Sequence, residues 1–207
     1  MIKRIAIELR RHAPFTAFGA LSGIAIMAII VLVSVSPRIS EFVFYIFHPI
    51  HVVLSALVTT AMYKRYGGGR LWPAILIGYS GSIGIATLSD SIIPYLGGVL
   101  LGAEMEFHVG FIEKWWLVNP LACLGIAVGY LRPTTEFPHA GHVLLSTWAS
   151  LFYFAAFGVA KWIPLLPLIF LFLFLAVWLP CCVSDIVYPL LFLRGDKPQS
   201  TASRHHH

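Results

Sequence analysis

Histidine and aspartate residues recur in the same order in the two halves of an otherwise apolar chain. The pattern His-x-x-His-Val-x-Leu-Ser occupies residues 48–55 and again residues 139–146. Each copy is followed by Ser-Asp-x-x-x-Pro, at residues 89–94 and at residues 184–189. Two different polar patterns that recur at similar spacing indicate an internal duplication. Because imidazole and carboxylate groups are ligands for Zn²⁺, Mn²⁺ and Fe²⁺, we predict that each half carries a metal site.

The predicted metal ligands of the two sites are His48, His51, Asp90, His139, His142 and Asp185. His48 and His51 are three residues apart, so both rings project from one face of a helix. Ser55 extends this face by one turn, and Ser146 does the same after His142, which makes both serines candidate additional ligands. Because consecutive membrane helices run antiparallel, we expect each histidine pair to lie level with the aspartate of its own half. The two clusters would then open toward opposite faces of the membrane.

Proline residues at a fixed distance from the aspartates add backbone oxygens to the predicted sites. Pro94 has no N–H to donate to the carbonyl of Asp90, and Pro189 has none for Asp185. In a lipid environment such a carbonyl needs another partner, and a cation, water or hydroxyl would supply it. The ordinary alternative is that these polar residues only stabilise helix kinks and helix–helix contacts.

Four side chains near the predicted membrane surfaces are further candidate ligands, namely His12, His108, Glu104 and Glu106. His12 lies on the side to which the second cluster would open, and the other three lie on the side of the first. Each half could therefore lend a ligand to the site of the other half. The alternative is that they are ordinary interface residues.

Cysteine residues occur only within apolar runs, at Cys123, Cys181 and Cys182. They form no disulfide framework, and we interpret them as small buried hydrophobic residues. A role as soft metal ligands is the alternative for Cys181 and Cys182, which precede Asp185 by four and three residues.

Composition places the chain in a membrane. Of its 207 residues, 58% are hydrophobic and only 11% are charged, whereas a soluble domain has about 25% charged residues. The net charge of +5 comes from residues that flank the apolar runs, so we predict no nucleic-acid partner. The expected partners are the lipid bilayer and a metal ion, and a homo-oligomer is left open.

Six apolar segments have the length of membrane-spanning helices, at residues 14–36, 42–63, 71–96, 115–131, 138–160 and 164–193. The predicted class is therefore an all-α polytopic membrane protein. With the N-terminus inside, 11 of the 14 Lys and Arg residues fall on the inner side. This bias predicts cytoplasmic N- and C-termini in the plasma membrane.

Three segments in each half force the two halves into opposite orientations. This is the inverted-repeat architecture of many secondary transporters. We predict a three-helix repeat at 1–98, an extramembrane amphipathic connection at 99–114, and a second three-helix repeat at 115–198. The tail at 199–207 has the composition of an expression-tag remnant and is set aside.

The function predicted from these patterns is transport of a divalent transition-metal cation such as zinc, manganese or iron, with proton coupling as a variant. A first alternative is an intramembrane zinc-dependent hydrolase acting on a lipid, assisted by Ser55 or Ser89. A second is a b-type haem protein that transfers electrons across the membrane. Its axial ligands would have to face each other from different helices, as His108 with the first histidine pair and His12 with the second could do. No catalytic residue is assigned.

Overall fold

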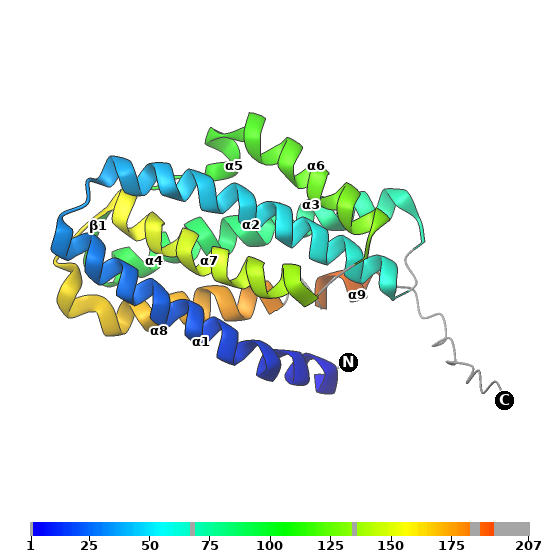
Figure 1. Ribbon diagram of the computed structural model, residues 1–207, viewed down its shortest axis with the longest axis horizontal. Helices are drawn as coiled ribbons and strands as arrows, with labels where there is room; N and C mark the ends of the chain where they lie inside the picture. The colour runs from blue at the N-terminus through cyan, green and yellow to red at the C-terminus, as the bar shows by residue number, and fades with distance from the viewer. Residues whose placement is uncertain (1, 67–68, 134–135, 183–186, 193–207) are drawn as a thin grey trace.

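The computed structural model describes residues 2–66, 69–133, 136–182 and 187–192. In chain order its elements are α1 (Ile2–Val33), α2 (Pro37–Arg65), α3 (Leu71–Thr87), the π-helical segment η1 (Leu88–Ile92), α4 (Ile93–Leu100), β1 (Glu104–Met105), α5 (Gly110–Glu113), α6 (Trp115–Leu131), α7 (Glu136–Phe157), β2 (Gly158–Val159), α8 (Trp162–Cys182) and α9 (Tyr188–Leu191). The long helices run side by side along one axis of an elongated bundle, as Figure 1 shows. The all-α class predicted from the sequence is confirmed.

Helix length and composition indicate an integral membrane protein. The described helical stretches that are long and apolar enough to cross a bilayer are Thr16–Val33, Pro37–Arg65, Leu71–Leu100 and Trp162–Cys181. Two shorter apolar helices are Trp115–Leu131 and Gly141–Phe157. The described part of each predicted apolar segment is therefore mostly helical, and four of the helical stretches have the length of a membrane span.

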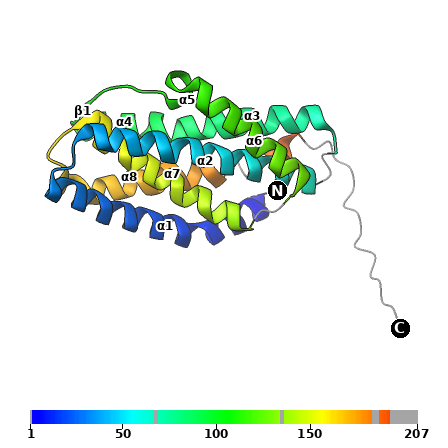
Figure 2. The same ribbon diagram turned by 45° about the horizontal axis from the view of Figure 1, so that its top comes forward.

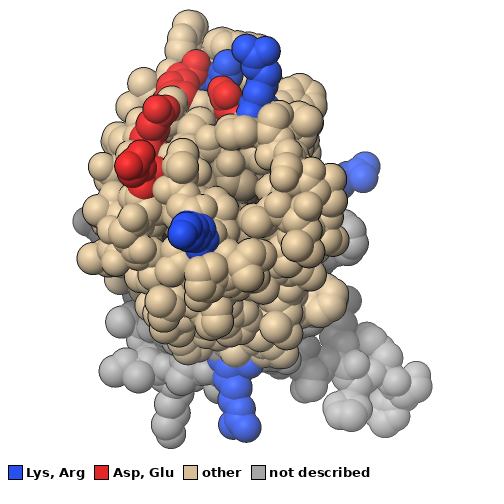
Figure 3. All heavy atoms as spheres, turned by 90° about the vertical axis from the view of Figure 1, so that its left-hand side faces the viewer, with Lys and Arg blue, Asp and Glu red and all other residues tan. Residues whose placement is uncertain are grey.

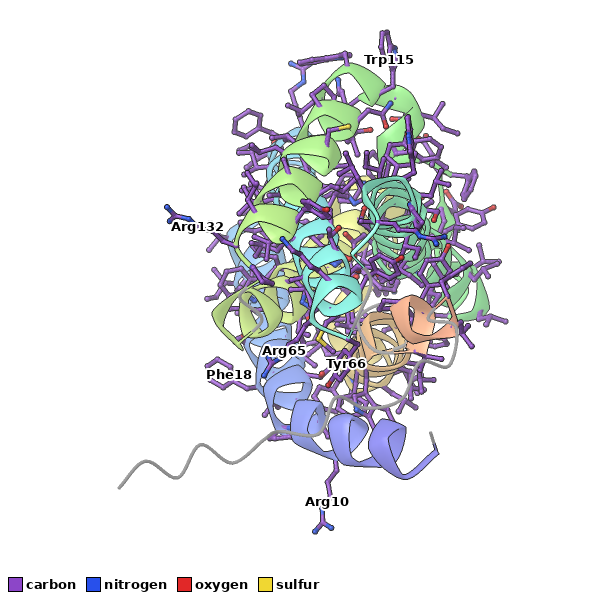
Figure 4. The ribbon with its side chains drawn as sticks, turned by 90° about the vertical axis from the view of Figure 1, so that its right-hand side faces the viewer. Arg10, Phe18, Arg65, Tyr66, Trp115 and Arg132 are labelled. Carbon is purple, nitrogen blue, oxygen red and sulfur yellow. The ribbon has the colours of Figure 1, made fainter. Side chains whose placement is uncertain are left out.

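The outer surface of the bundle is apolar, as a lipid environment requires. Large side chains such as Phe18, Leu32 and Leu131 are exposed on the helices. In Figure 4, Phe18 points away from the bundle, and so does Trp115 at the start of α6. A soluble monomer rarely exposes contiguous apolar surface on this scale, so these side chains are best explained by contact with lipid.

Helix α2 is central and packs against α7 on one side and α6 on another. Figures 1 and 2 both show α2 alongside α7, and the two helices run in opposite directions. Two glycines of α6 allow the close approach to α2. A Cβ added at Gly125 would lie 2.3 Å from the carbonyl oxygen of Val53, and one at Gly129 would lie 2.3 Å from that of Leu57. This spacing of small residues brings two helix backbones into contact.

The connection between the third and fourth apolar segments crosses one end of the bundle. Strand β1 pairs antiparallel with β2 in a two-stranded ribbon, with Glu104 opposite Val159. The backbone N–H of His108 then donates to the Tyr153 hydroxyl at 2.8 Å, and the one-turn helix α5 follows. The predicted amphipathic connection is thus a short ribbon and one helical turn held against the end of α7.

The described helices do not show the repeated three-helix unit that the sequence predicts. The third apolar segment contains the π-helical segment η1. The corresponding part of the second half includes residues 183–186, which lie outside the described residues. The repeat therefore remains a prediction.

Candidate metal centre

Two histidines of α2 share one buried aspartate of η1. The Nδ1 atom of His48 lies 2.9 Å from Oδ2 of Asp90, and Nδ1 of His51 lies 2.7 Å from the same oxygen. All three side chains have 0% exposure. The sequence prediction that this histidine pair lies level with the aspartate of its own half is met by the geometry.

The second carboxylate oxygen of Asp90 accepts hydrogen bonds from two serines. The Ser89 hydroxyl donates to Oδ1 at 2.7 Å, and the Ser146 hydroxyl of α7 donates to Oδ1 at 2.8 Å. With these bonds Asp90 has four donors for its two oxygens. When Asp90 is ionised it has no proton to donate, so both imidazoles donate from Nδ1, and each ring in its neutral form then keeps a lone pair on Nε2. Asp90 thus orients the two rings, as carboxylates do behind metal-bound histidines.

The π-helical segment η1 gives Asp90 its position. The N–H of Ile93 donates to the carbonyl of Leu88, five residues back, where an α-helix would use the residue four back. Pro94 follows and has no N–H for the α-helical pattern to use. The wider turn carries Ser89 and Asp90 on the buried side of the segment, and π-bulges of this kind occur often at functional sites.

A third histidine joins the first two. The ring of His142, on α7, stacks on that of His51, with centroids 5.7 Å apart and planes inclined by 7°. His51, His142 and Cys181 each offer one ligand atom, and these atoms lie within 4.8 Å of one another. Since Nδ1 of His51 is engaged by Asp90, Nε2 is the His51 nitrogen left for a metal ion.

This group, called the buried triad (His51, His142 and Cys181), could hold a metal ion. Its donors come from three helices, α2, α7 and α8, and all three side chains are buried. Around a tetrahedral Zn²⁺ with bonds of about 2.0–2.3 Å, donor atoms are roughly 3.3–3.7 Å apart, so binding would draw the triad together by at most about 1.5 Å.

The position of His142 differs from the expectation that the two histidine motifs open toward opposite faces. His51 is at the middle of α2 and His142 is one and a half turns into α7. Because the two helices pack along their length, both residues reach the same depth in the bundle. The hydrogen bond from Ser146 of α7 to Asp90 of η1 also joins a residue of the second half to one of the first half at this depth.

Cys181 belongs to the triad, although the sequence interpretation as a small buried hydrophobic residue left it outside the ligand set. A signal was present, because Cys181 precedes Asp185 by four residues, just as Ala86 precedes Asp90. One helical turn before the aspartate is a position that faces the same way as the aspartate.

Several other predicted ligands cannot be compared with the structure. Asp185 lies outside the described residues, and the same holds for the side chains of His12, His139 and Cys182. Ser55 is buried, and its hydroxyl has no hydrogen-bond partner among the described residues. Their metal-binding roles stay predictions.

His108 and the acidic residues near it form a separate group toward the end of the bundle at which α2 begins, called here the end cluster (Glu106, His108, Glu113 and Tyr45). Nδ1 of His108 lies 3.1 Å from Oε1 of Glu113, and Nε2 lies 3.4 Å from Oε2 of Glu106. The Tyr45 hydroxyl donates to the Glu113 carboxylate. Figure 3 shows Asp and Glu side chains gathered along one edge of this end face. Glu104 is exposed on β1 beside the end cluster.

Glu113 is an anion held by several donors. Burial raises the pKa of its carboxyl, but hydrogen bonds from Tyr45, from the backbone N–H of Val109 and from His108 lower it by more, so the net pKa lies below its ordinary value. The end cluster therefore presents a carboxylate at neutral pH.

The stacked imidazoles do not suit haem ligation. Imidazole lone pairs lie in the ring plane, so two axial ligands must point a nitrogen at the iron from opposite sides. His51 and His142 instead present their faces to each other. His108 is hydrogen-bonded within the end cluster and stacks on Phe157, with centroids 4.1 Å apart.

Comparison with protein-family models, with curated proteins and with solved structures finds no match for the chain. Fold and site together define a helical integral membrane protein with a buried His/His/Cys group that could hold a metal ion.

Proposed function

We propose that the protein binds a transition-metal ion at the buried triad and carries it across the membrane. The observation that carries this proposal is the position of the triad, fully buried at the middle of α2 and supplied by three helices. Imidazole and thiolate donors favour Zn²⁺ over harder ions such as Mn²⁺. Intramembrane ionisable groups generally belong to substrate or ion pathways.

The way in which the halves pack supports an inverted repeat. The first helix of each half packs on the other half, since α1 contacts α7 and α8 while α6 contacts α2 and α3. The triad and the Ser146–Asp90 hydrogen bond both join residues of the two halves. Transporters of this architecture place their ion site near the bilayer midplane, at the interface between repeats.

Charge placement supports cytoplasmic termini. Arg10, Arg65 and Arg132 lie at the end of the bundle seen in Figure 4, and Arg10 and Arg132 project outward. Strand β1 and the start of α2 lie at the opposite end (Figure 1), and Figure 3 shows Asp and Glu side chains on the face seen from that side. A basic inner face follows the positive-inside rule. The end cluster is then on the outer side.

An intramembrane zinc hydrolase is the second candidate. Three protein ligands leave a fourth tetrahedral position for water, as in catalytic zinc sites. Asp90 behind His51 also completes the carboxylate–histidine–zinc arrangement that raises ligand basicity. Such a site would cleave a lipid ester, amide or phosphate bond with zinc-bound water.

Metal binding is tested first, with Co²⁺ as a spectroscopic substitute for Zn²⁺. Purified protein should develop a thiolate-to-cobalt charge-transfer band in the near ultraviolet, because Cys181 is a ligand. Cys181→Ser should lose this band. The matched control is Cys123→Ser, which removes an exposed thiol of α6 and should keep the band. A wild-type protein without the band contradicts the proposed metal site.

Transport and catalysis are then separated in proteoliposomes. A transporter should take up Zn²⁺ at a rate that His142→Ala reduces at least tenfold, and chelator-sensitive lipid hydrolysis should not accompany it. A protein that binds Co²⁺ through Cys181, moves no Zn²⁺ and hydrolyses lipid is a hydrolase. A bound ion with neither activity leaves only a structural role.

A further inference from the structure

We propose that α5 and the residues before it form a gate that closes the buried triad to ions arriving from the end of the bundle at which α2 begins. This inference rests on the proposed metal-binding function and adds to it a control of access to the same site. The gate segment is defined as residues 106–113, which run from the end of β1 to the end of α5.

The triad is sealed from water in this structure, so an ion reaches it only when part of the bundle moves. His51 and His142 are completely buried, and Cys181 is 1% exposed. In Figures 1 and 2, α5 lies beside α2, some way along that helix from its start. The gate segment thus reaches from the end of the bundle to the depth of buried polar residues.

The backbone of α5 covers the edge of the His48 ring. A Cβ added at Gly110 would lie 2.6 Å from Cδ2 of His48 and 2.9 Å from its Nε2. The hydrogen bond to Asp90 and the stack on Phe44 hold this ring, so a larger residue at position 110 could not approach as closely. His48 and His51 bond to the same Asp90 oxygen. An ion that passed α5 would therefore meet a hydrogen-bonded group that includes a ligand of the triad.

Phe111 fills the space beside His48 with an apolar ring. It packs against a buried cluster that α2, α3 and α6 supply, consisting of Val52, Ile83, Ala86, Val118 and Ala122. Val52 follows His48 by four residues, so both lie on one face of α2. An apolar side chain packed against three helices beside His48 excludes water and a hydrated ion.

Hydrogen bonds to Glu113 hold the gate segment in this position. Its carboxylate accepts from the Tyr45 hydroxyl of α2 and from the backbone N–H of Val109, the latter at 3.1 Å. Nδ1 of His108 lies 3.1 Å from Oε1 of Glu113, and the backbone N–H of His108 donates to the Tyr153 hydroxyl of α7 at 2.8 Å. The Tyr45–Glu113 bond thus ties α5 to α2, and His108 ties the segment to α7.

These contacts are of a kind that opens at low cost. The Glu113 side chain is 36% exposed, so water can replace its donors when the segment moves. Helix α5 has a single turn, no side-chain hydrogen bond from its N-cap residue Val109, and an exposed side chain at Ile112. Segments with few buried apolar contacts and solvent-accessible hydrogen bonds belong to the least stable parts of a fold, from which moving lids are drawn.

The rate of Co²⁺ binding to the full-length protein in detergent tests the gate, with the Cys181 charge-transfer band followed by stopped flow. Tyr45→Phe removes the hydroxyl that ties α5 to α2. The band should then develop on Co²⁺ addition, and decay on chelator addition, at least fivefold faster than in the wild type. The dissociation constant should stay within twofold, because an open gate speeds entry and exit alike. Gly110→Ala should act in the same way, since its methyl group keeps α5 from closing on His48.

Tyr79→Phe is the matched control. It also removes a tyrosine hydroxyl from a hydrogen bond between elements, because Tyr79 of α3 donates to Asn119 of α6 at 3.0 Å. This bond lies outside the gate segment, so both rates should equal those of the wild type.

The two rates separate a gate from a structural contact. Rates unchanged in Tyr45→Phe and Gly110→Ala overturn the gate and leave the proposed function intact. A change confined to one of the two rates, with a shifted dissociation constant, also overturns it, because the contact then stabilises or weakens the triad itself. A wild type without the band defeats the proposed function. An unchanged dissociation constant in the variants shows that the triad is intact and the protein folded.

Discussion

Replacing Ser146 by alanine tests whether Asp90 is held as a buried anion. The Ser146 hydroxyl donates to Oδ1 of Asp90 at 2.8 Å, from α7 across to η1. Ser150, one turn further along α7, is equally buried, but the acceptors within reach of its hydroxyl are two neutral carbonyls, that of Ser146 at 2.7 Å and that of Ser89 at 2.9 Å. Ser146→Ala and Ser150→Ala therefore remove the same group from the same helix and differ in the charge of the acceptor.

The expected magnitudes differ enough to be separated. Interhelical hydrogen bonds between neutral groups in membrane proteins contribute about 0.6 kcal/mol on average. Hydrogen bonds to charged groups contribute about 1.5–3 kcal/mol. Asp90 would keep three of its four donors in Ser146→Ala, so the loss should be that of one charged hydrogen bond and not of the whole network. We expect about 2 kcal/mol for Ser146→Ala and under about 1 kcal/mol for Ser150→Ala.

Reversible unfolding in mixed micelles, followed by tryptophan fluorescence, measures both free energies of unfolding. Equal losses for the two variants would mean that the acceptor is not an anion. The assignment of Nδ1 protons to both histidines would then fail, and with it the lone pair on Nε2 of His51 that the metal site requires.

Three further outcomes follow from the geometry. Asp90→Asn should weaken Co²⁺ binding at the triad by about 10–100-fold, because it removes the carboxylate behind His51, and a titration with an unchanged dissociation constant would refute that role. Gly125→Ala should destabilise the bundle by about 1–3 kcal/mol through contact with the α2 backbone, whereas Gly84→Ala, which meets nothing within 4 Å, should stabilise it by about 0.5–1 kcal/mol. The pKa of the Glu113 carboxyl is lower in the folded protein than its ordinary value. Ionised Glu113 therefore contributes fully to the free energy of unfolding above the ordinary carboxyl pKa, and this contribution is lost as the pH falls through the pKa of the folded protein. Glu113→Gln should remove this pH-dependent part of the free energy of unfolding, measured by unfolding curves at acidic pH values across that range.

The membrane class and the positions of the helices could be predicted from the sequence because both depend on local composition. A run of apolar residues has to satisfy its backbone hydrogen bonds internally in lipid, and a helix does so whatever its neighbours are. Pairing of the first histidines with Asp90 was predictable for a similar reason. The turn between α2 and α3 is short, so the two helices run antiparallel and residues at fixed distances from the turn meet.

Tertiary packing alone decided which residues of the two halves meet. The sequence treated the histidine motifs as separate clusters, and nothing local specifies that α2 lies against α7 or at what register. That register depends on side-chain packing along both helices, and it places the His142 ring on His51. Cys181 enters the triad because α8 lies beside them, and a cysteine in an apolar run carries no sign of its neighbours in the fold. Composition and spacing thus determined the elements and one aspartate–histidine cluster, whereas the metal-binding group exists only where three separately specified helices come together.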